Sequence, residues 1–337
     1  MHDIRLAVGL IGFLSVGIFL AGRRLCSPLP PRGLDTVAVG LLFLMIGYLR
    51  FVWGQLWIVN WIPLPSVIVL SNWFPLLLAA LGAVVWLRLD GDGALEAGKP
   101  EEDGSSGQLV EDTDELPAQK SDHTLAIRRT VMMVAIILGG AWSVMYFVPR
   151  TPPECGSQWD PPYPPFPWKI CRQTNSYTCS AASSATMLTT LGIPATEQEM
   201  ARLCLTRNGT TWLGLYHGLS TKLLRTRYRI NFFESDIERL PQLAKQHPVL
   251  LCCKLDAAAA DKRPDLEQEG GWIRGTAHSV VYFGRFRGVH IIGDPSRGYE
   301  AWKDDDLKVL WTGQGLHITE SPQQPMPTTS ADSTVTK

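Results

Sequence analysis

The chain has 337 residues, of which 45% are hydrophobic and 19% are charged, whereas about 25% of the residues in a typical soluble protein are charged. Because 31 Lys and Arg meet 32 Asp and Glu, the chain lacks the excess positive charge with which nucleic-acid binders attract phosphates. Seven Cys in this length are too few for a disulfide scaffold. We therefore exclude a disordered or collagenous chain and expect no nucleic-acid partner.

Long apolar runs dominate the first half of the chain. Three of them lie at residues 4–21, 37–52 and 67–87, and a fourth lies at 131–148. Each run is close to the roughly 20 residues that a helix needs to cross a bilayer. We predict a membrane region at 1–89 with about three transmembrane helices and a fourth transmembrane helix at 128–148, so the lipid bilayer is an expected partner.

Basic residues flank these runs unevenly. On a chain with four spans, six arginines fall on the same side of the membrane: Arg23, Arg24, Arg32, Arg88, Arg128 and Arg129. An excess of Lys and Arg marks cytoplasmic loops. The N-terminus and the globular half are therefore expected outside, and we predict an integral protein of a bacterial inner or plasma membrane with an extracytoplasmic domain.

Four segments have other compositions. Residues 90–127 are acidic and rich in Gly and Ser, which predicts a disordered loop. Repeated Pro at 149–168 predicts an extended, semi-rigid tether, and the polar residues 319–337 predict a disordered tail. The apolar stretch 57–65 contains two Pro and is expected to be interfacial or re-entrant, with its Trp side chains at headgroup level.

Residues 169–318 are expected to form one domain. Apolar spacing predicts helices at 180–191, 197–205 and 237–246 and strands at 248–254, 279–286 and 289–292. Thr196 and Glu199 have the spacing of a capping box at the second helix. Because the helices come before most of the strands, we predict an α+β domain with helices packed on an antiparallel sheet.

Four residues of this domain have the types that a cysteine hydrolase needs. Cys179 stands at the start of the first predicted helix, where unpaired N–H groups stabilise a thiolate, although a lone Cys there is more often an inert core residue. His278 opens one predicted strand and Asp294 ends the next, so antiparallel pairing can bring them together. Gln173 lies six residues before Cys179. Such a site uses a nucleophilic thiol, a proton-transferring imidazole, an acceptor that orients it and an oxyanion donor.

Other candidate groups are weaker. His290 lies four residues before Asp294, but residues four apart on one strand are far apart in space, so His278 is the better candidate base. We find no ligand spacing typical of zinc and predict neither a metal nor a cofactor. Six Cys fall on the predicted outer side, where disulfides are possible.

The motifs of this domain resemble those of the bacteriocin-processing cysteine peptidases, the papain-like double-glycine leader peptidases. The matching residues are Gln173, Cys179, Leu191-Gly192-Ile193-Pro194, Ala277-His278-Ser279-Val280-Val281, Asp294-Pro295, Gly298 and Trp311-Thr312-Gly313. The resemblance covers residues 171–315 and none of the membrane half. It implies a papain-like fold with Cys179 as nucleophile, His278 as general base and acid, Asp294 as the orienting residue and Gln173 as the oxyanion donor.

Two features depart from this family. Ser180 stands where the family usually has Gly, and the chain has no Gly-rich phosphate loop of an ABC exporter. We predict a membrane-anchored cysteine peptidase that acts on a peptide or protein substrate, with a separate exporter as a further candidate partner. The alternatives are a papain-like amidase or acyltransferase acting on cell-wall peptide, and a catalytically silent peptide-binding module. A transporter is disfavoured because no charged residue lies deep in a span.

Overall fold

The computed structural model describes residues 2–97, 117–145, 147 and 151–320. The chain forms two compact units. One unit contains Met1–Gln55 and Ile68–Pro149, and the other contains Leu56–Val67 and Arg150–Lys337.

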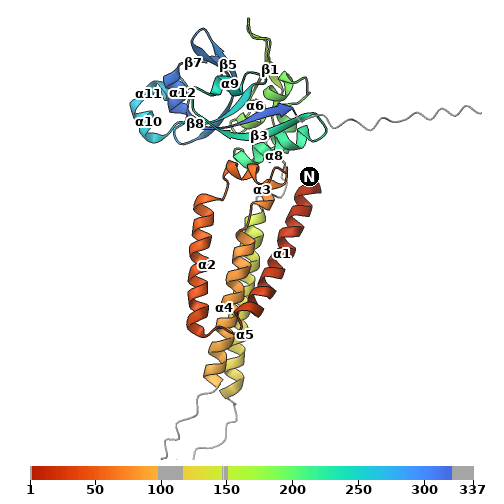
Figure 1. Ribbon diagram of the computed structural model, residues 1–337, viewed down its shortest axis with the longest axis vertical. Helices are drawn as coiled ribbons and strands as arrows, with labels where there is room; N and C mark the ends of the chain where they lie inside the picture. The colour runs from red at the N-terminus through yellow and green to blue at the C-terminus, as the bar shows by residue number, and fades with distance from the viewer. Residues whose placement is uncertain (1, 98–116, 146, 148–150, 321–337) are drawn as a thin grey trace, which may run out of the picture. The chain divides into compact units, whose positions relative to one another are not determined.

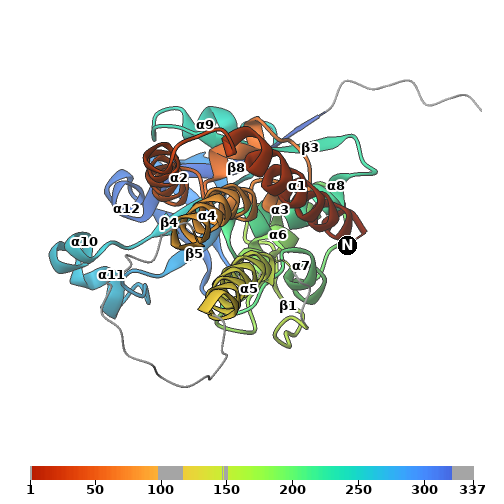
Figure 2. The ribbon, with the colours of Figure 1, turned by 90° about the horizontal axis from the view of Figure 1, so that it is seen from below.

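The first unit is a bundle of long apolar helices. They are α1 (His2–Cys26), α2 (Pro31–Phe51), α4 (Phe74–Ala97) and α5 (Pro117–Met145), with the short α3 (Val67–Leu70) before α4. α4 packs against α1, α2 and α5, as the end-on view in Figure 2 shows. Four helical stretches are long and apolar enough to cross a membrane. The predicted α-helical region with about four long apolar helices is therefore confirmed.

The second unit is built on an antiparallel sheet of six strands in the order β3-β8-β4-β5-β6-β7 (Figure 1). The strands are β3 (Tyr228–Glu234), β4 (Val249–Lys254), β5 (Ala277–Phe286), β6 (Val289–Asp294), β7 (Gly298–Trp302) and β8 (Trp311–Glu320). The helices are α6 (Cys179–Thr190), α7 (Glu197–Leu203), α8 (Trp212–Leu223), α9 (Leu240–Leu243), α10 (Ala257–Lys262), α11 (Pro264–Gln268) and α12 (Asp304–Leu310). The predicted α+β class is confirmed.

Both faces of the central strands are buried. Val249 and Leu251 of β4 belong to a core cluster that also contains Trp302 of β7 and Leu310 of α12. The residues that alternate with them on β4 face the other side, where α6 packs against β4 and β5. A strand that is covered on two faces needs a continuous apolar run, and this explains the sequence Val-Leu-Leu-Cys-Cys in β4.

Some elements differ from those predicted. The helix expected at 237–246 is only the single turn α9, and β3, β7, β8 and α8 had no counterpart in our prediction. Gly313 and Gly315 weaken the strand pattern of β8. Gly315 is required because a side chain there would collide with the Leu250 carbonyl of β4.

The predicted acidic loop and tail lie largely outside the described residues. Within 90–127, α4 continues to Ala97 and α5 begins at Pro117, and residues 98–116 are not described. Of the predicted tail at 319–337, the first two residues belong to β8, and the others are not described.

Much of the segment expected to be a free tether is packed on the sheet. Its strand β1 (Gln158–Asp160) pairs with β2 (Ile170–Arg172). Trp168 stacks on Phe283 of β5 with 4.8 Å between the ring centroids, and its carbonyl accepts a 2.6 Å hydrogen bond from the Tyr299 hydroxyl. The aromatic side chains between the prolines therefore hold residues 158–168 against the globular unit.

The short segment between the second and third apolar helices also belongs to the globular unit. It contains the 3₁₀-helix η1 (Leu56–Asn60), which packs against β3. Leu56, Ile58 and Val59 are each at most 2% exposed. The apolar stretch that we expected to be interfacial or re-entrant thus uses part of its apolar surface against the sheet.

Candidate active site

Cys179 is the first residue of α6, and α6 is fixed to the strand that carries His278. Small residues in its first turns, Ala181 and Ala182, are fully buried and allow close packing against β5. Ser183 Oγ donates to the Ser279 carbonyl at 2.8 Å, and the Ser180 and Ser279 hydroxyls lie 2.7 Å apart. These bonds place the start of α6 beside the start of β5.

Antiparallel pairing of β5 with β6 brings His278 and Asp294 together. Val281 pairs with Gly293, so both side chains lie at the same end of the two strands. His278 Nε2 lies 3.0 Å from each oxygen of Asp294. Asp294 is 1% exposed and also accepts a 2.7 Å hydrogen bond from the Ser296 amide. The carboxylate can therefore hold the imidazole in one orientation.

The thiol of Cys179 contacts the imidazole and is shifted toward the thiolate. Burial raises the pKa of Cys179, but the hydrogen bond and positive charge of His278 lower it, as do the Ser279 amide and the Ser180 hydroxyl, and the net pKa is below the ordinary value. Burial lowers the pKa of His278, whereas the charge and hydrogen bond of Asp294 and the contact with Cys179 raise it to about 10. The two shifts favour a thiolate–imidazolium pair.

The other cysteines of the globular unit behave in the opposite way. Burial raises the pKa of the Cys155 thiol to about 11 and the pKa values of Cys171 and Cys204 to about 12. Burial also raises the pKa values of Cys252 and Cys253. All of these thiols are free. Their raised pKa values favour the unreactive thiol form, and the contact with His278 distinguishes Cys179 from them.

Gln173 lies at the same site through a backbone tie. Its amide N–H donates to the Pro295 carbonyl at 2.8 Å, directly after Asp294. The side-chain amide donates to the Asn175 carbonyl at 3.2 Å, and its oxygen is buried without a hydrogen-bond partner among the described residues. One of the two amide N–H bonds remains available for an oxyanion.

The four predicted residues line one cavity of about 200 Å³. The segment from Gly270 to Ile273 also lines it, and Gly271 in this segment adopts φ +69°. Trp272 places its indole edge-on to His278, with 5.2 Å between the ring centroids. Ile273 is 67% exposed beside the cavity. The thiol thus opens into a narrow space with an apolar rim.

Glu197 is a buried residue of the site that the sequence analysis missed. It is 0% exposed at the start of α7. Its carboxylate accepts hydrogen bonds from the Thr174 amide at 2.9 Å, the Thr174 hydroxyl at 2.8 Å and the Thr178 hydroxyl at 2.5 Å. Glu197 therefore fixes the loop that joins Gln173 to Cys179. The capping pattern around Thr196 predicts a helix start exposed to solvent. The sequence therefore gives no sign that Glu197 is buried and binds the loop before Cys179.

His290, the rival base, does not line the cavity. It is fully buried, and its ring nitrogens lie 3.2 Å from the Tyr282 hydroxyl and 2.9 Å from Asp304. It links β6 to α12.

The sequence analysis also missed Ser296, whose amide donates a hydrogen bond to Asp294. Only its position two residues after Asp294 could have indicated this role. Within the described part of the chain, no cluster of three or more His, Cys, Asp or Glu could hold a metal ion.

No protein-family model matches the chain. An uncharacterised protein of Methanothermobacter thermautotrophicus is 44% identical over 59 residues, which is 17% of this chain and 42% of that protein. The match thus spans less than half of that relative.

Solved structures similar to the chain are peptidase domains. The peptidase domain of Streptococcus ComA, a bi-functional ABC transporter involved in quorum sensing, is 20% identical, with a TM-score of 0.36 over 46% of this chain and 99% of that chain. The peptidase domain of Streptococcus mutans ComA is 18% identical, with a TM-score of 0.31 over 44% and 98%. A double-glycine motif protease of an AMS/PCAT transporter, solved with its leader peptide, is 16% identical, with a TM-score of 0.33 over 51% and 96%.

Proposed function

We propose that the protein is a membrane-anchored, papain-like cysteine peptidase that hydrolyses peptide bonds with Cys179, His278, Asp294 and Gln173. The observation that carries this proposal is the convergence in one cavity of the buried Cys179 thiol and the His278 imidazole, which lies 3.0 Å from the buried Asp294 carboxylate. The lowered pKa of Cys179 is consistent with this arrangement. Strongly perturbed titratable groups that meet in a cavity are typical of active sites.

In the proposed reaction the Cys179 thiolate attacks the substrate carbonyl. The Cys179 amide N–H and the Gln173 side chain stabilise the oxyanion. The His278 imidazolium gives its proton to the leaving amine, and a thioester remains on Cys179. His278 then takes a proton from water, which attacks the thioester and releases the acid. Proton transfer by a positioned imidazole contributes about 10²–10⁴-fold to such rates.

The test is labelling of the full chain with a peptidyl epoxide probe for cysteine peptidases, together with hydrolysis of a peptide library read by mass spectrometry. Wild type and Cys155→Ala, a control cysteine outside the cavity, should label and cleave. Cys179→Ala and His278→Ala should do neither while remaining folded. Cleavage by Cys179→Ala would refute the mechanism. Labelling without cleavage of any library peptide would favour acyl transfer or action on cell-wall peptide.

We further propose that the peptidase domain lies outside the cytoplasmic membrane and that its substrate is a peptide, with a separate exporter as a candidate partner. The flanking arginines support this orientation. The second unit also joins the segment Leu56–Val67 to residues 150–337. Such a unit is expected if α4 and α5, which lie between the two segments, both cross the membrane. Two crossings return the chain to the same side.

A further inference from the structure

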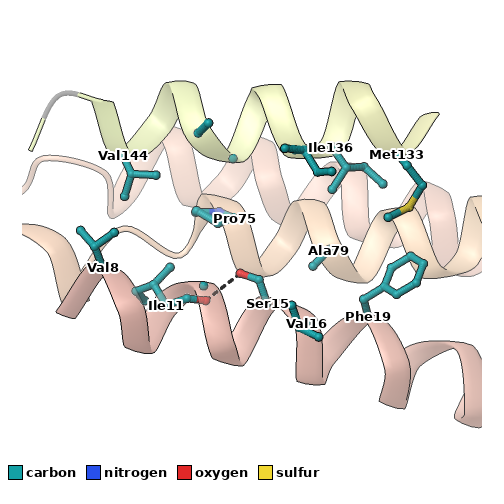
Figure 3. Close-up of a pocket in the computed structure, with 14 residues that line it drawn as sticks. Val8, Ile11, Ser15, Val16, Phe19, Pro75, Ala79, Met133, Ile136 and Val144 are labelled. Carbon is teal, nitrogen blue, oxygen red and sulfur yellow. Dashed lines mark hydrogen bonds between the residues drawn. The ribbon is translucent and has the colours of Figure 1, made fainter. Parts of the chain in front are cut away.

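The helical bundle contains an apolar groove of about 360 Å³ between α1, α4 and α5. Figure 3 shows side chains of α1, from Val8 to Phe19, opposite side chains of α5, from Val144 to Met133, with Ala79 of α4 between them. The hydroxyl of Ser15, which lies in the groove, donates to the carbonyl of Ile11 in its own helix at 2.8 Å. The lining therefore offers apolar contact and no free hydroxyl donor from Ser15.

The groove has the dimensions of an alkyl chain. From Val8 to Phe19 it extends about 16 Å along α1 at the helical rise of about 1.5 Å per residue. This length is about half of the roughly 30 Å hydrocarbon core of a bilayer. The volume spread over this length gives a mean cross-section of roughly 20 Å², which is too narrow for another helix about 10 Å across.

Two arginines lie one helical turn beyond the same end of the groove. Arg23 follows Phe19 on α1, and Arg129 precedes Met133 on α5. Both guanidinium groups lie against the Trp86 ring, 5.0 and 5.4 Å from its centroid. The indole thus gathers two positive charges at the end of an apolar slot.

The charges at this end are not balanced by the carboxylate beside them. Arg129 pairs with Asp90. The Nε atoms of Arg23 and Arg129 are both buried without a hydrogen-bond partner among the described residues. The neighbouring arginines Arg24 and Arg128 are exposed instead. Two inward guanidinium groups therefore meet one described carboxylate, and an anion would balance the remaining positive charge.

We propose that this groove binds one anionic phospholipid, with an acyl chain between α1 and α5 and its phosphate at Arg23 and Arg129. The apolar groove accounts for the acyl chain, and the surplus positive charge of the two arginines accounts for a head group with net negative charge. Zwitterionic lipids carry their own cation next to the phosphate and gain less from the same pair. Basic pockets between transmembrane helices are known to bind anionic head groups in this way.

The binding of an acyl chain is tested by filling the groove with a larger side chain. Native mass spectrometry of the full-length protein in detergent, with equal amounts of phosphatidylglycerol and phosphatidylcholine, should show one phosphatidylglycerol retained by wild type. A Cβ at Gly12 meets nothing within 4 Å, so Gly12→Leu can place its side chain in the groove that Gly12 lines. Gly12→Leu should lose about tenfold in retention. Gly9→Leu is the matched control, because Gly9 has equally open space and is not a lining residue.

The head-group part is tested with the arginines. Arg23→Gln should reduce retention of phosphatidylglycerol to that of phosphatidylcholine, and the exposed Arg24→Gln should retain the preference of wild type. Gly140→Leu fills the groove from α5 and replaces Gly12→Leu if that variant does not fold. The proposed site would be refuted if the variants with a filled groove retained as much phosphatidylglycerol as wild type. It would also be refuted if Gly9→Leu and Gly12→Leu lost phosphatidylglycerol to the same extent. Chain retention without a head-group preference would refute the role of the arginines.

Discussion

The thiols of Cys179 and Cys204 are both buried, yet their pKa values move in opposite directions. Cys204 is 1% exposed, and burial raises its pKa to about 12. Cys179 is 8% exposed, but the adjacent imidazolium, together with the Ser279 amide and the Ser180 hydroxyl, more than offsets the effect of burial on its pKa. The reactivity of Cys179 therefore depends on His278 and not on exposure.

This dependence predicts distinct pH profiles for alkylation and hydrolysis. Alkylation of Cys179 by iodoacetamide should rise with pH through a value below 9.0, the ordinary thiol pKa, because the folded pKa is lowered. Peptide hydrolysis should share this acid limb and fall again near pH 10, where His278 loses its proton. In His278→Ala the alkylation limb should move to higher pH, since burial is then opposed only by the hydrogen bonds from the Ser279 amide and the Ser180 hydroxyl. An unchanged limb in that variant would exclude the ion pair.

A second prediction concerns Glu197. Glu197→Leu removes the acceptor of three hydrogen bonds from the loop between Gln173 and Cys179. We expect peptide hydrolysis to fall by about tenfold or more, the factor for a barrier raised by about 1.4 kcal/mol. Because His278 sets the thiol pKa, the acid limb of alkylation should stay in place. Glu197→Gln keeps one acceptor oxygen and should recover most of the rate. A shift of the alkylation limb in Glu197→Leu would instead indicate general loosening of the site.

The sequence indicated the groups with unusual chemistry but not those that support them. Cys179, His278 and Asp294 could be chosen because thiol, imidazole and carboxylate stand at predicted element ends. Ser296 and Glu197 have common residue types in ordinary positions, and their roles follow only from three-dimensional contacts. The hydrogen-bond partners of Glu197, Thr174 and Thr178, lie 23 and 19 residues earlier in the chain, and no local pattern encodes such contacts.

At the scale of elements, the contact between α6 and β5 carries the site. The hydroxyls of Ser180 and Ser279 hydrogen-bond each other in a buried position, 2.7 Å apart, and join the nucleophile helix to the strand of His278. The residue that departs from the resembled family, Ser180, is thus part of this junction.

This junction predicts non-additive effects on stability. Ser180→Ala leaves the Ser279 hydroxyl buried without this partner and should lower the free energy of unfolding by about 1–3 kcal/mol. Ser279→Ala should have a similar effect. The double variant removes both polar groups and should be less destabilised than the sum of the two. Urea denaturation of the three variants gives the coupling energy, and strict additivity would mean that the bond contributes nothing.

Elements with strong local patterns were predictable, and elements set by tertiary contacts were not. The predicted strands at 248–254 and 279–286 correspond to β4 and β5, because their central runs, residues 249–253 and 280–283, are apolar and buried. β8 has two glycines within a strand, and its Gly315 is explained only by the closeness of β4. The Pro-rich segment has the composition of a spacer, but the stacking of Trp168 on Phe283 holds it on the sheet.

At the scale of the molecule, the proposed orientation makes a direct prediction. Cys155 is partly exposed, and Cys179 is the activated thiol. In intact cells with a permeable outer envelope, a membrane-impermeant cysteine-peptidase probe should label wild type and Cys155→Ala but not Cys179→Ala. Labelling that appears only after lysis would place the domain in the cytoplasm and leave the proposed chemistry unchanged.

The packing of η1 against β3 has a consequence for how the domain is made. Residues 56–60 leave the ribosome long before β3, which is an edge strand of the sheet. The N-terminal half of the chain thus supplies one segment of the globular unit before the rest of that unit has been synthesised. A soluble fragment that begins at residue 150 would lack Leu56, Ile58 and Val59 and would expose the apolar surface that they cover. We expect such a fragment to aggregate, and a synthetic peptide of residues 55–67 to keep it monomeric in light-scattering measurements.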